Sequence, residues 1–275
     1  MTIAERESTL TGQLWNISGE SSGSGRNWFK LLSTRPPRLS PREQLESRET
    51  ECFRFLREVP LERRYVLIGG YAVSSFQFPR YSVDLDIVIP QRELHFFQSL
   101  ARTRGFEFKK KYDVENVHGA RSLVYSKNIG VKVGLDLMVN AVYSRQTRFA
   151  YPFELLFEHS DPREVRGRGL DARAKTRVAS REMLLALKTN SARSQDMRDI
   201  LALCYEKPQT RTVVALLGKC PRDEILENLR KLEAYLSIAK PDSFRSMFSA
   251  NPSVLKRSIE HCESLLAELW KSLKT

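Results

Sequence analysis

Two aspartates, Asp84 and Asp86, are separated by one residue inside the run DLDIVI. Side chains alternate between the two faces of a strand, so both carboxylates would point the same way while Leu85 and Ile87 enter the core. Carboxylates on one face of a buried strand repel each other and lose hydration unless a cation joins them. Hard oxygen ligands at this spacing suit Mg²⁺, which usually adds waters and substrate phosphates to its shell. The pair therefore predicts a metal-assisted site; the alternative is a solvated strand edge.

A pair of glycines, Gly69 and Gly70, ends another apolar run upstream of the acids. The run from Tyr65 to Ile68 predicts a strand, and residues 71–76 predict a short helix. Glycine lets the backbone approach a ligand closely, and a helix N-terminus favours an anion. A glycine pair alone can be a simple turn, but this order of elements favours phosphates held above the two acids.

The order strand, Gly69-Gly70, thirteen residues and then Asp84-x-Asp86 resembles the signature of the DNA polymerase β-like nucleotidyltransferase superfamily. Arg80 and Ser82, just before the acids, resemble in particular the AbiEii/MenT-type branch. The resemblance implies in-line nucleotidyl transfer, in which catalysis consists mostly of positioning and charge neutralisation.

A third strand-borne acid, Asp136, lies between Leu135 and Leu137 in the run VKVGLDLMV. Residues 122–126 and 130–139 predict two successive strands. In the superfamily the third carboxylate lies on such a later strand, so Asp136 is the matching position. The alternative is an isolated aspartate on an edge strand.

Another part of the resemblance lies in a predicted helix pair, where LLALK is followed by an arginine and by D-x-x-D-I. Its polar members are Lys188, Arg193, Asp196 and Asp199. The resemblance implies that Lys188 reaches a triphosphate as a point charge and that Asp196 orients this lysine or a substrate group. Asp199, three residues further along the same helical face, would be a supporting partner. The alternative is an ordinary ion pair within a helix hairpin.

The resemblance thus implies a site for two metal ions, Mg²⁺ or Mn²⁺, with an NTP as substrate. The metal ligands would be Asp84, Asp86 and Asp136. The catalytic residues would be these three together with Lys188 and Asp196. The nucleotide-binding residues would be Gly69, Gly70, Arg80, Ser82 and Lys188.

Basic residues outnumber acidic ones by 45 to 33, which gives a formal net charge of +12. Such a surplus favours a polyanionic partner, and nucleic acid is the commonest candidate. A basic run from 163 to 181 directly precedes the first helix of this pair, and a smaller basic patch spans 109–111. The residues predicted to bind RNA are Arg163, Arg166, Arg168, Arg173, Lys175 and Arg177. The alternative is a solvated loop.

Length and residue usage narrow the class of protein. The 275 residues, 41% of them hydrophobic, support a folded core and exclude a disordered scaffold. The four cysteines form no CxxC pair and the four histidines are dispersed, so we expect buried thiols, with no zinc and no disulfides. No signal peptide and no long apolar run is present, so we expect a cytoplasmic protein.

Three regions are expected along the chain. Residues 1–40 predict a weakly ordered arm, with Trp15, Trp28 and Phe29 docking on the body. Residues 41–178 predict a nucleotidyltransferase catalytic domain, with helices over 41–59, capped by Ser40, and over 91–104. Residues 179–275 predict a helical domain, whose first helix is capped by Ser180. The fold class is therefore α+β, a nucleotidyltransferase-type mixed sheet with flanking helices followed by a helical C-terminal bundle.

The favoured function is a metal-dependent nucleotidyltransferase that moves NMP from an NTP to an acceptor hydroxyl. RNA is the favoured acceptor, a tRNA 3′ end being one form of it, and an AbiEii-like toxin with a cognate antitoxin is the role that family analogy suggests. Two alternatives stay open. One is transfer to a protein side chain or a small molecule, and the other is an inactive scaffold that binds RNA or nucleotide.

Overall fold

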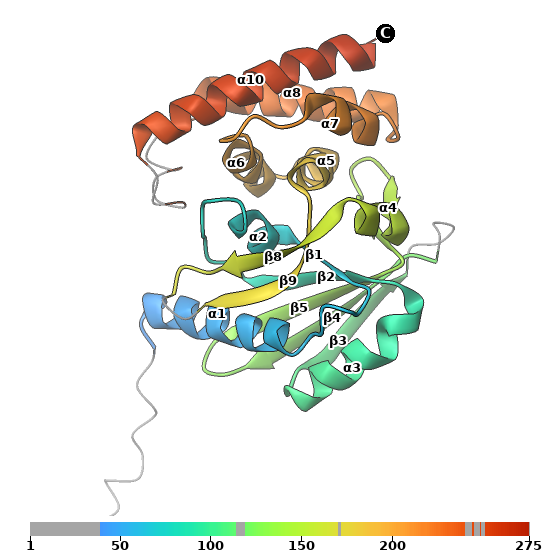
Figure 1. The fold of residues 1–275 in the computed structure, drawn as a ribbon, viewed down its shortest axis with the longest axis vertical. Coiled ribbons are helices and arrows are strands. Elements are labelled where there is room, and N and C mark those ends of the chain that lie inside the picture. Colours follow the sequence, from blue (N-terminus) through green and yellow to red (C-terminus); the bar gives the residue numbers. More distant parts are fainter. Residues whose placement is uncertain are drawn as a thin grey trace, which may run out of the picture. The chain divides into compact units, whose positions relative to one another are not determined.

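Helices flank a mixed sheet whose strands all precede the helical C-terminal part (Figure 1). The computed structural model describes residues 39–113, 119–169, 172–239 and 251–274, together with 244 and 248. Of the expected N-terminal arm (residues 1–40), residues 1–38 therefore lie outside the described residues. Residues 245–247 also lie outside them. Among the described residues, no helix is long and apolar enough to cross a membrane. The α+β fold class is confirmed.

The described elements follow one another as α1 (Pro41–Arg57), β1 (Val66–Ile68), α2 (Gly69–Ser74), β2 (Asp84–Ile89), a 3-10 turn (Gln91–Glu93), α3 (Leu94–Thr103), β3 (Glu107–Asp113), β4 (Arg121–Asn128), β5 (Lys132–Val139), β6 (Ala141–Tyr143), β7 (Ala150–Pro152), α4 (Phe153–Glu158), β8 (Ser160–Arg166), β9 (Arg173–Ala179), α5 (Arg181–Ser191), α6 (Ser194–Leu203), α7 (Thr210–Leu217), α8 (Arg222–Ile238) and α10 (Pro252–Lys274).

Seven strands form the main sheet, in the order β3-β4-β5-β2-β1-β9-β8, and β6 and β7 form a separate pair. β2 and β5 run parallel, as do β1 and β9, and the other neighbours are antiparallel. The acid-bearing strands β2 and β5 are thus adjacent near the middle of the sheet, and its two edges are the lysine-rich strand β3 and the strand β8, which carries both arginines and acids.

The ends of α1 and α5 follow the predicted capping chemistry. Ser40 accepts a hydrogen bond from the backbone of Glu43, whose side chain accepts one in return from the Ser40 amide, so the predicted helix start is confirmed. Ser180 caps α5 by accepting from the Met183 amide. The helix after the glycine pair begins at Gly69, two residues earlier than expected.

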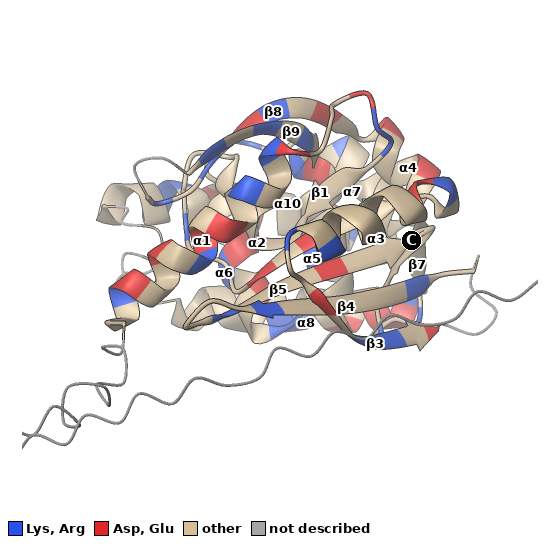
Figure 2. Cartoon of the chain, turned by 90° about the horizontal axis from the view of Figure 1, so that it is seen from below, with Lys and Arg blue, Asp and Glu red and all other residues tan. Residues whose placement is uncertain are grey.

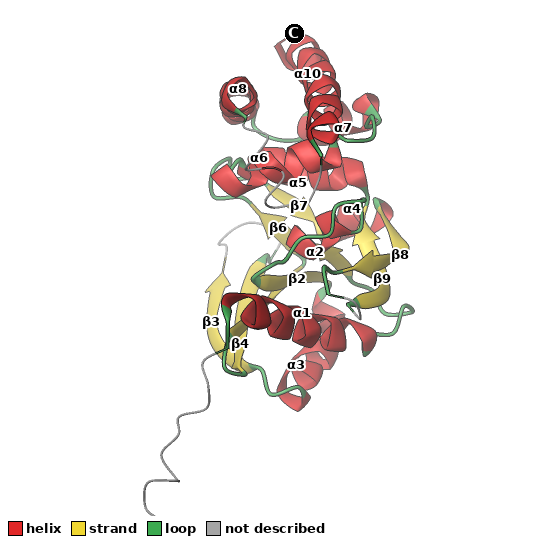
Figure 3. Cartoon of the chain, turned by 90° about the vertical axis from the view of Figure 1, so that its left-hand side faces the viewer, coloured by secondary structure: helices red, strands yellow, loops and turns green. Residues whose placement is uncertain are grey.

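Apolar packing lies on both sides of the sheet. α1 and α3 cover one face, where Phe53, Phe55 and Phe97 are fully buried (Figures 1 and 3). On the other side, α2 contacts α5 and α6, on which α7, α8 and α10 are layered. Residues 39–275 form one compact unit. The expected boundary between a catalytic and a helical domain, at 178/179, stays a prediction.

Most of the basic run from 163 to 181 forms the β8–β9 hairpin, so it is not the solvated loop that was considered as the alternative. In β9 small or apolar residues (Ala174, Thr176, Val178) are buried and alternate with Arg173, Lys175 and Arg177, which are exposed or half-buried. This period-two pattern is the signature of a half-buried strand, and the density of charge concealed it.

Candidate active site

The three aspartates of the sequence motif lie on one face of two neighbouring strands. Asp86 on β2 is the direct cross-strand partner of Asp136 on β5, and Asp84 is the partner of Gly134. Neighbouring strands are about 4.8 Å apart, so the carboxylates of Asp86 and Asp136 leave the sheet side by side. All three acids are half-buried, whereas Leu85 and Leu135 on the other face are fully buried. The predicted alternation of faces in both strands is confirmed.

Glycines leave room for these carboxylates. A Cβ atom at Gly134 would lie 1.9 Å from Oδ1 of Asp84, and one at Gly69 would lie 1.9 Å from Oδ2 of Asp86. Gly69 also has a φ of +70°, which side-chain-bearing residues rarely adopt. The glycine pair therefore has a role besides any approach of a phosphate, because its first member accommodates Asp86. Gly134 was missed in the sequence, although a glycine within a predicted strand indicates a close approach.

The acids share too little compensating charge. Loss of hydration, followed by the charges of Asp136 and Asp84, raises the pKa of Asp86 to about 7, and Lys188 and Arg193 offset this only in part. Loss of hydration and the charge of Asp84 likewise raise the pKa of Asp136 to about 6. Burial also raises the pKa of Asp84, against the opposing charges of Lys132 and Arg48. Negative charge at this face is therefore under-neutralised.

A divalent cation would relieve this excess. The side-chain oxygens of Asp84, Asp86 and Asp136 are hard ligands of the kind that Mg²⁺ and Mn²⁺ prefer. As the side chains stand, no group of three or more Asp, Glu, His or Cys residues in the described part of the chain is arranged to hold a metal ion. The donor set therefore fits a hard cation by chemistry and charge, but not by the present arrangement of its side chains.

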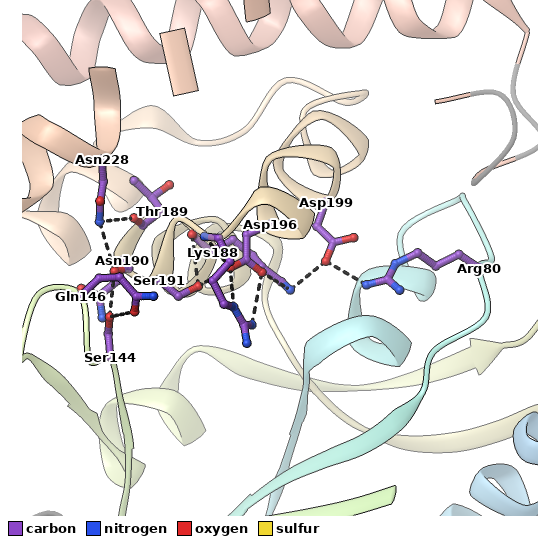
Figure 4. Close-up of polar contacts among 11 residues, drawn as sticks. Arg80, Ser144, Gln146, Lys188, Thr189, Asn190, Ser191, Asp196, Asp199 and Asn228 are labelled. Carbon is purple, nitrogen blue, oxygen red and sulfur yellow. Dashed lines mark hydrogen bonds and ion pairs between the residues drawn. The ribbon is translucent and has the colours of Figure 1, made fainter. Parts of the chain in front are cut away.

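The helix pair α5–α6 carries a second charged cluster, in which each carboxylate lies beside a cation (Figure 4). Nζ of Lys188 lies 2.8 Å from Oδ1 of Asp196 and 2.7 Å from Oδ2 of Asp199. Asp196 also accepts from Nε of Arg193 at 2.9 Å and from the hydroxyl of Ser191 at 2.6 Å. Lys188, Asp196 and Asp199 are all buried. The helix-hairpin ion pair considered from the sequence is therefore present, and a role in nucleotide binding stays a prediction.

Compensation sets the protonation states of this cluster. Burial opposes the charge on Lys188, but Asp199 and Asp196 outweigh it and raise the pKa of the lysine. Burial would raise the pKa of Asp196, but Lys188 and Arg193 outweigh it and lower that pKa to about 2. Both residues are thus ionised at neutral pH.

Arg80 connects the glycine loop to this cluster. Its NH2 group lies 2.9 Å from Oδ2 of Asp199, so Asp199 joins the guanidinium to the Lys188 ammonium. The Arg80 backbone is held by the Ser74 hydroxyl, and the Ser82 carbonyl accepts from Tyr71. A Cβ at Gly70 would lie 2.5 Å from Oγ of Ser82 and 2.9 Å from NH2 of Arg80. Residues 80 to 82 are therefore packed onto the second glycine.

The two clusters belong to one site. The charges of Lys188 and Arg193 act on Asp86, and α2, which begins at Gly69, contacts both α5 and α6. The structure thus brings Gly69, Gly70, Arg80, Ser82, Asp84, Asp86, Asp136, Lys188 and Asp196 into one region. Arg193 was part of the sequence resemblance but had no predicted role, and it proves to be the second cation on Asp196.

The residues predicted to bind RNA lie outside this constellation, along β8, β9 and the turn between them. Arg163 lies 4.2 Å from the Phe76 ring centroid and Arg168 lies 5.6 Å from that of Tyr81, beside the segment that carries Arg80. Arg166 pairs with Glu164, and Arg173 and Lys175 are exposed. Arg177 is half-buried, where it donates to the Ser160 carbonyl.

The four cysteines are all buried and all are free thiols. Burial raises the pKa of Cys52 to about 12 and that of Cys220 to about 11. Neutral, buried thiols of this kind are poor nucleophiles. The cysteines therefore belong to the packing and not to the site.

The chain is similar to a known protein family and to solved structures. The family model described as "Nucleotidyl transferase AbiEii toxin, Type IV TA system" matches residues 53–229. No curated protein matches the chain. One similar solved structure is a candidate nucleotidyltransferase from H. pylori, with 15% identity, a TM-score of 0.42, and coverage of 86% of this chain and 98% of that chain. Another is the antibiotic-resistance factor ANT(2'')-Ia, with 12% identity, a TM-score of 0.42, and coverage of 63% and 89%.

The family match spans well over half of the chain and contains the glycine pair, the three aspartates and the Lys188 cluster. Proteins of this kind are nucleotidyltransferases, which use an NTP and a divalent metal in general. The chain belongs to the AbiEii family of nucleotidyl transferases, the toxins of type IV toxin–antitoxin systems.

Proposed function

We propose that this protein transfers a nucleoside monophosphate from an NTP to a hydroxyl of RNA, at a site that holds divalent cations between Asp84, Asp86 and Asp136. The observation that carries the proposal is the register of β2 and β5, which places Asp86 beside Asp136 on a half-exposed face. The raised pKa values of both acids support the same conclusion, because charge of this kind is stabilised by a cation.

The cationic side of the site would hold the triphosphate. An ammonium group has three N–H donors, and Lys188 directs two of them to Asp196 and Asp199, which leaves one for a phosphate oxygen. Arg80 and Ser82 lie on the loop packed against Gly70, at the start of the short helix. Asp196 and Asp199 would keep Lys188 in place, so that its charge is positioned before the substrate arrives.

The reaction would be an in-line displacement. The acceptor hydroxyl gives up its proton to solvent and its oxygen forms a bond to the α-phosphorus, the bond from that phosphorus to the bridging oxygen breaks, and pyrophosphate leaves. Divalent cations, when bound, would lower the pKa of the acceptor hydroxyl and neutralise charge on the phosphates. The chain's own contribution is to orient the two reactants from opposite sides, with the carboxylates on the sheet and Lys188 and Arg80 toward the helices.

An RNA acceptor is favoured by the distribution of positive charge. Lys and Arg positions gather along β8 and β9 and again along β3, at opposite edges of the sheet that carries the acids in its middle (Figure 2). A small acceptor offers few charges and needs no such surface, whereas a nucleic acid backbone gains affinity from each neutralised phosphate. A tRNA 3′ end is the form of RNA that we propose first, because it is single-stranded and ends in hydroxyls.

The decisive experiment is incubation of the protein with labelled NTPs, Mg²⁺ and total cellular RNA. We expect label in the RNA fraction, concentrated in tRNA and removed by 3′ exonuclease. Asp86→Asn should give no label, and Asp161→Asn, which changes an exposed carboxylate on β8, should behave as wild type. Label in protein or in small molecules instead would refute the RNA acceptor, and no label from any NTP would refute transfer.

The basic hairpin can be tested separately. Changing Arg163, Arg166 and Arg168 together to Gln should weaken RNA binding and flatten its dependence on salt, because fewer counterions are released. Nucleotide binding should be unaffected. A matched control is the change of the exposed residues Lys219, Arg230 and Lys256 to Gln, which removes equal charge from the C-terminal helices. Equal affinity and slope for the two triple variants would refute the hairpin as an RNA surface.

The toxin role belongs to the same proposal. Family membership implies a partner antitoxin. We expect expression of the wild-type chain to arrest growth and the Asp86→Asn variant to be tolerated at the same protein level. Arrest by both variants would separate toxicity from transfer.

A further inference from the structure

The edge strand β3 carries an aromatic side chain with two cations over its ring. Nζ of Lys110 lies 4.8 Å from the centroid of the Tyr112 ring, and Cζ of Arg145 lies 5.3 Å from the same centroid. All three side chains are exposed, with 37% of Tyr112 accessible to solvent. Lys110 belongs to the basic patch at 109–111, which the proposed function uses only as positive charge along β3, without a specific contact. Lys110, Tyr112 and Arg145 together form the edge platform.

The edge platform shares a face and a row with the acids. Lys110 is the cross-strand partner of Val124, Val124 is the partner of Asp136, and Asp136 is the partner of Asp86. Cross-strand partners project from the same face, and two strand spacings amount to about 10 Å. In agreement, the charge of Lys110 acts to lower the pKa of Asp136. The edge platform is therefore a near neighbour of the acids on the sheet surface.

The surface between them is open. Val124, Ser122 and Met138, on the acid face of β4 and β5, are half-exposed, whereas Leu123 and Tyr125 on the other face are buried. A chain laid across this face can therefore run from Asp136 to the β3 edge.

The three lysines of the basic patch at 109–111 differ in whether they pair with a carboxylate. Lys109 pairs with Glu107 at 2.5 Å and Lys111 pairs with Asp113 at 2.8 Å. Within the parts of the chain that the structure describes, Lys110 and Arg145 have no carboxylate partner. The two cations over Tyr112 are thus the ones whose charge is available to a phosphate.

Arg145 is held in position by the active-site helix α5. It lies in the turn between β6 and β7, and its neighbour Ser144 donates to the Asn190 carbonyl at 2.9 Å (Figure 4). Thr147, at the other side of Arg145, donates to Oδ1 of Asn190 at 2.5 Å. Both anchors are buried, and Asn190 lies two residues after Lys188. The turn that presents Arg145 is therefore fixed to the element that presents Lys188.

We propose that the edge platform binds the single-stranded end of the RNA acceptor, with one base stacked on Tyr112 and the adjoining phosphates held by Lys110 and Arg145. Aromatic rings interleaved with cations bind single strands in this way, because every base has a face that can stack and every nucleotide carries a phosphate. The proposal rests on the proposed function for the identity of the acceptor, and it assigns the direction from which that acceptor enters.

The test measures binding of a fluorescent single-stranded RNA oligonucleotide, without NTP, and labelling of RNA in a separate assay. Stacking on one aromatic side chain should make Tyr112→Ala bind between about fivefold and about a hundredfold more weakly, with little change in salt slope. Tyr112→Phe keeps the ring and should bind as wild type. Arg145→Gln should weaken binding and reduce the slope by about one phosphate contact. Lys111→Gln, with the same loss of charge on the same strand, is the matched control and should change neither.

The outcomes separate this inference from the proposed function. If wild type labels RNA but Tyr112→Ala binds and labels it as well as wild type, the edge platform is refuted and transfer to RNA stands. If wild type binds the oligonucleotide through Tyr112 but labels no RNA, the platform stands and transfer to RNA is refuted. Specific labelling of a protein, with no binding of single-stranded RNA, would refute both. Thermal unfolding of Tyr112→Ala checks that this exposed change leaves the fold intact.

Discussion

The sheet and the helix pair differ in how far their carboxylates are compensated by nearby cations. On the sheet, Asp84, Asp86 and Asp136 bring three like charges together, and the pKa values of Asp86 and Asp136 rise to about 7 and about 6. Between α5 and α6, the carboxylate of Asp196 meets Lys188 and Arg193, and its pKa falls to about 2. The carboxylates of the helix cluster lie beside cations of the chain, whereas the carboxylates of the sheet cluster have too little positive charge near them.

This difference separates residues that hold the site together from those that await a ligand. A compensated cluster contributes to a unique arrangement of its helices, and removal of one member destabilises the fold. An uncompensated cluster destabilises the protein when no ligand is bound, and strain of this kind is typical of functional sites. The comparison therefore predicts opposite effects of similar substitutions in the two clusters.

The largest effect is expected for Asp196→Asn. The change leaves the buried ammonium group of Lys188 with Asp199 as its remaining carboxylate partner in this cluster, and removal of one partner from a buried pair costs about 3–5 kcal/mol. The free energy of unfolding, measured by denaturant titration, should fall by that amount. An unchanged value would mean that the helix cluster is not compensated by Asp196.

Asp86→Asn should lower activity without lowering stability. Loss of one electrostatic stabiliser of a transition state costs about 100- to 1,000-fold in rate, so labelling of acceptor should fall by at least about a hundredfold. The free energy of unfolding in the absence of divalent cations should stay equal or rise, because repulsion from Asp136 is relieved. A marked loss of stability would show that Asp86 is compensated after all, and near-full activity would remove it from the site.

The two clusters should also give opposite pH dependences in cation-free protein. The folded-state pKa of Asp86 is raised, so the folded state binds more protons than the unfolded state between about pH 4 and pH 7, and stability falls as pH rises through this window. The folded-state pKa of Asp196 is lowered to about 2, so its contribution is present above about pH 4 and is lost as pH falls toward 2.

Denaturant unfolding in EDTA at a series of pH values checks both signs. The stability of Asp86→Asn should coincide with that of wild type near pH 4 and exceed it near pH 7. The deficit of Asp196→Asn should instead shrink as pH falls below about 4. Parallel curves for wild type and either variant would contradict the shift assigned to that residue.

The smallest effect is expected from the cation itself. A ligand at ten times its dissociation constant stabilises the folded state by about 1.4 kcal/mol, so Mg²⁺ should raise the unfolding temperature of wild type by a few degrees. Asp86→Asn should lose this response and Asp161→Asn should keep it. Equal responses of all three proteins would indicate that Mg²⁺ binds elsewhere.

Local patterns in the sequence determined much of what positions the site. The alternation in DLDIVI and in VGLDLMV predicts two strands with acids on one face, and Ser40 and Ser180 predict helix starts, since alternation and capping depend on near neighbours in the chain. The glycine pair and the spacing to the acids were sufficient to relate the chain to a nucleotidyltransferase family. The strands β3, β6, β7, β8 and β9 were not predicted, and in β9 the dense charge concealed the strand pattern.

Tertiary structure alone decided which residues face each other. Nothing in the sequence places Asp136 opposite Asp86, gives Gly134 the task of accommodating Asp84, or joins Arg80 to Lys188 through Asp199, because each contact spans tens of residues and depends on how the strands and helices pack. The same holds for the edge platform, where Lys110 and Arg145 meet Tyr112 from different elements. The roles of single residue types could be predicted because their chemistry is local. Compensation of charge depends on the assembled fold, and it distinguishes the acid cluster on the sheet from the ion-paired cluster on the helices.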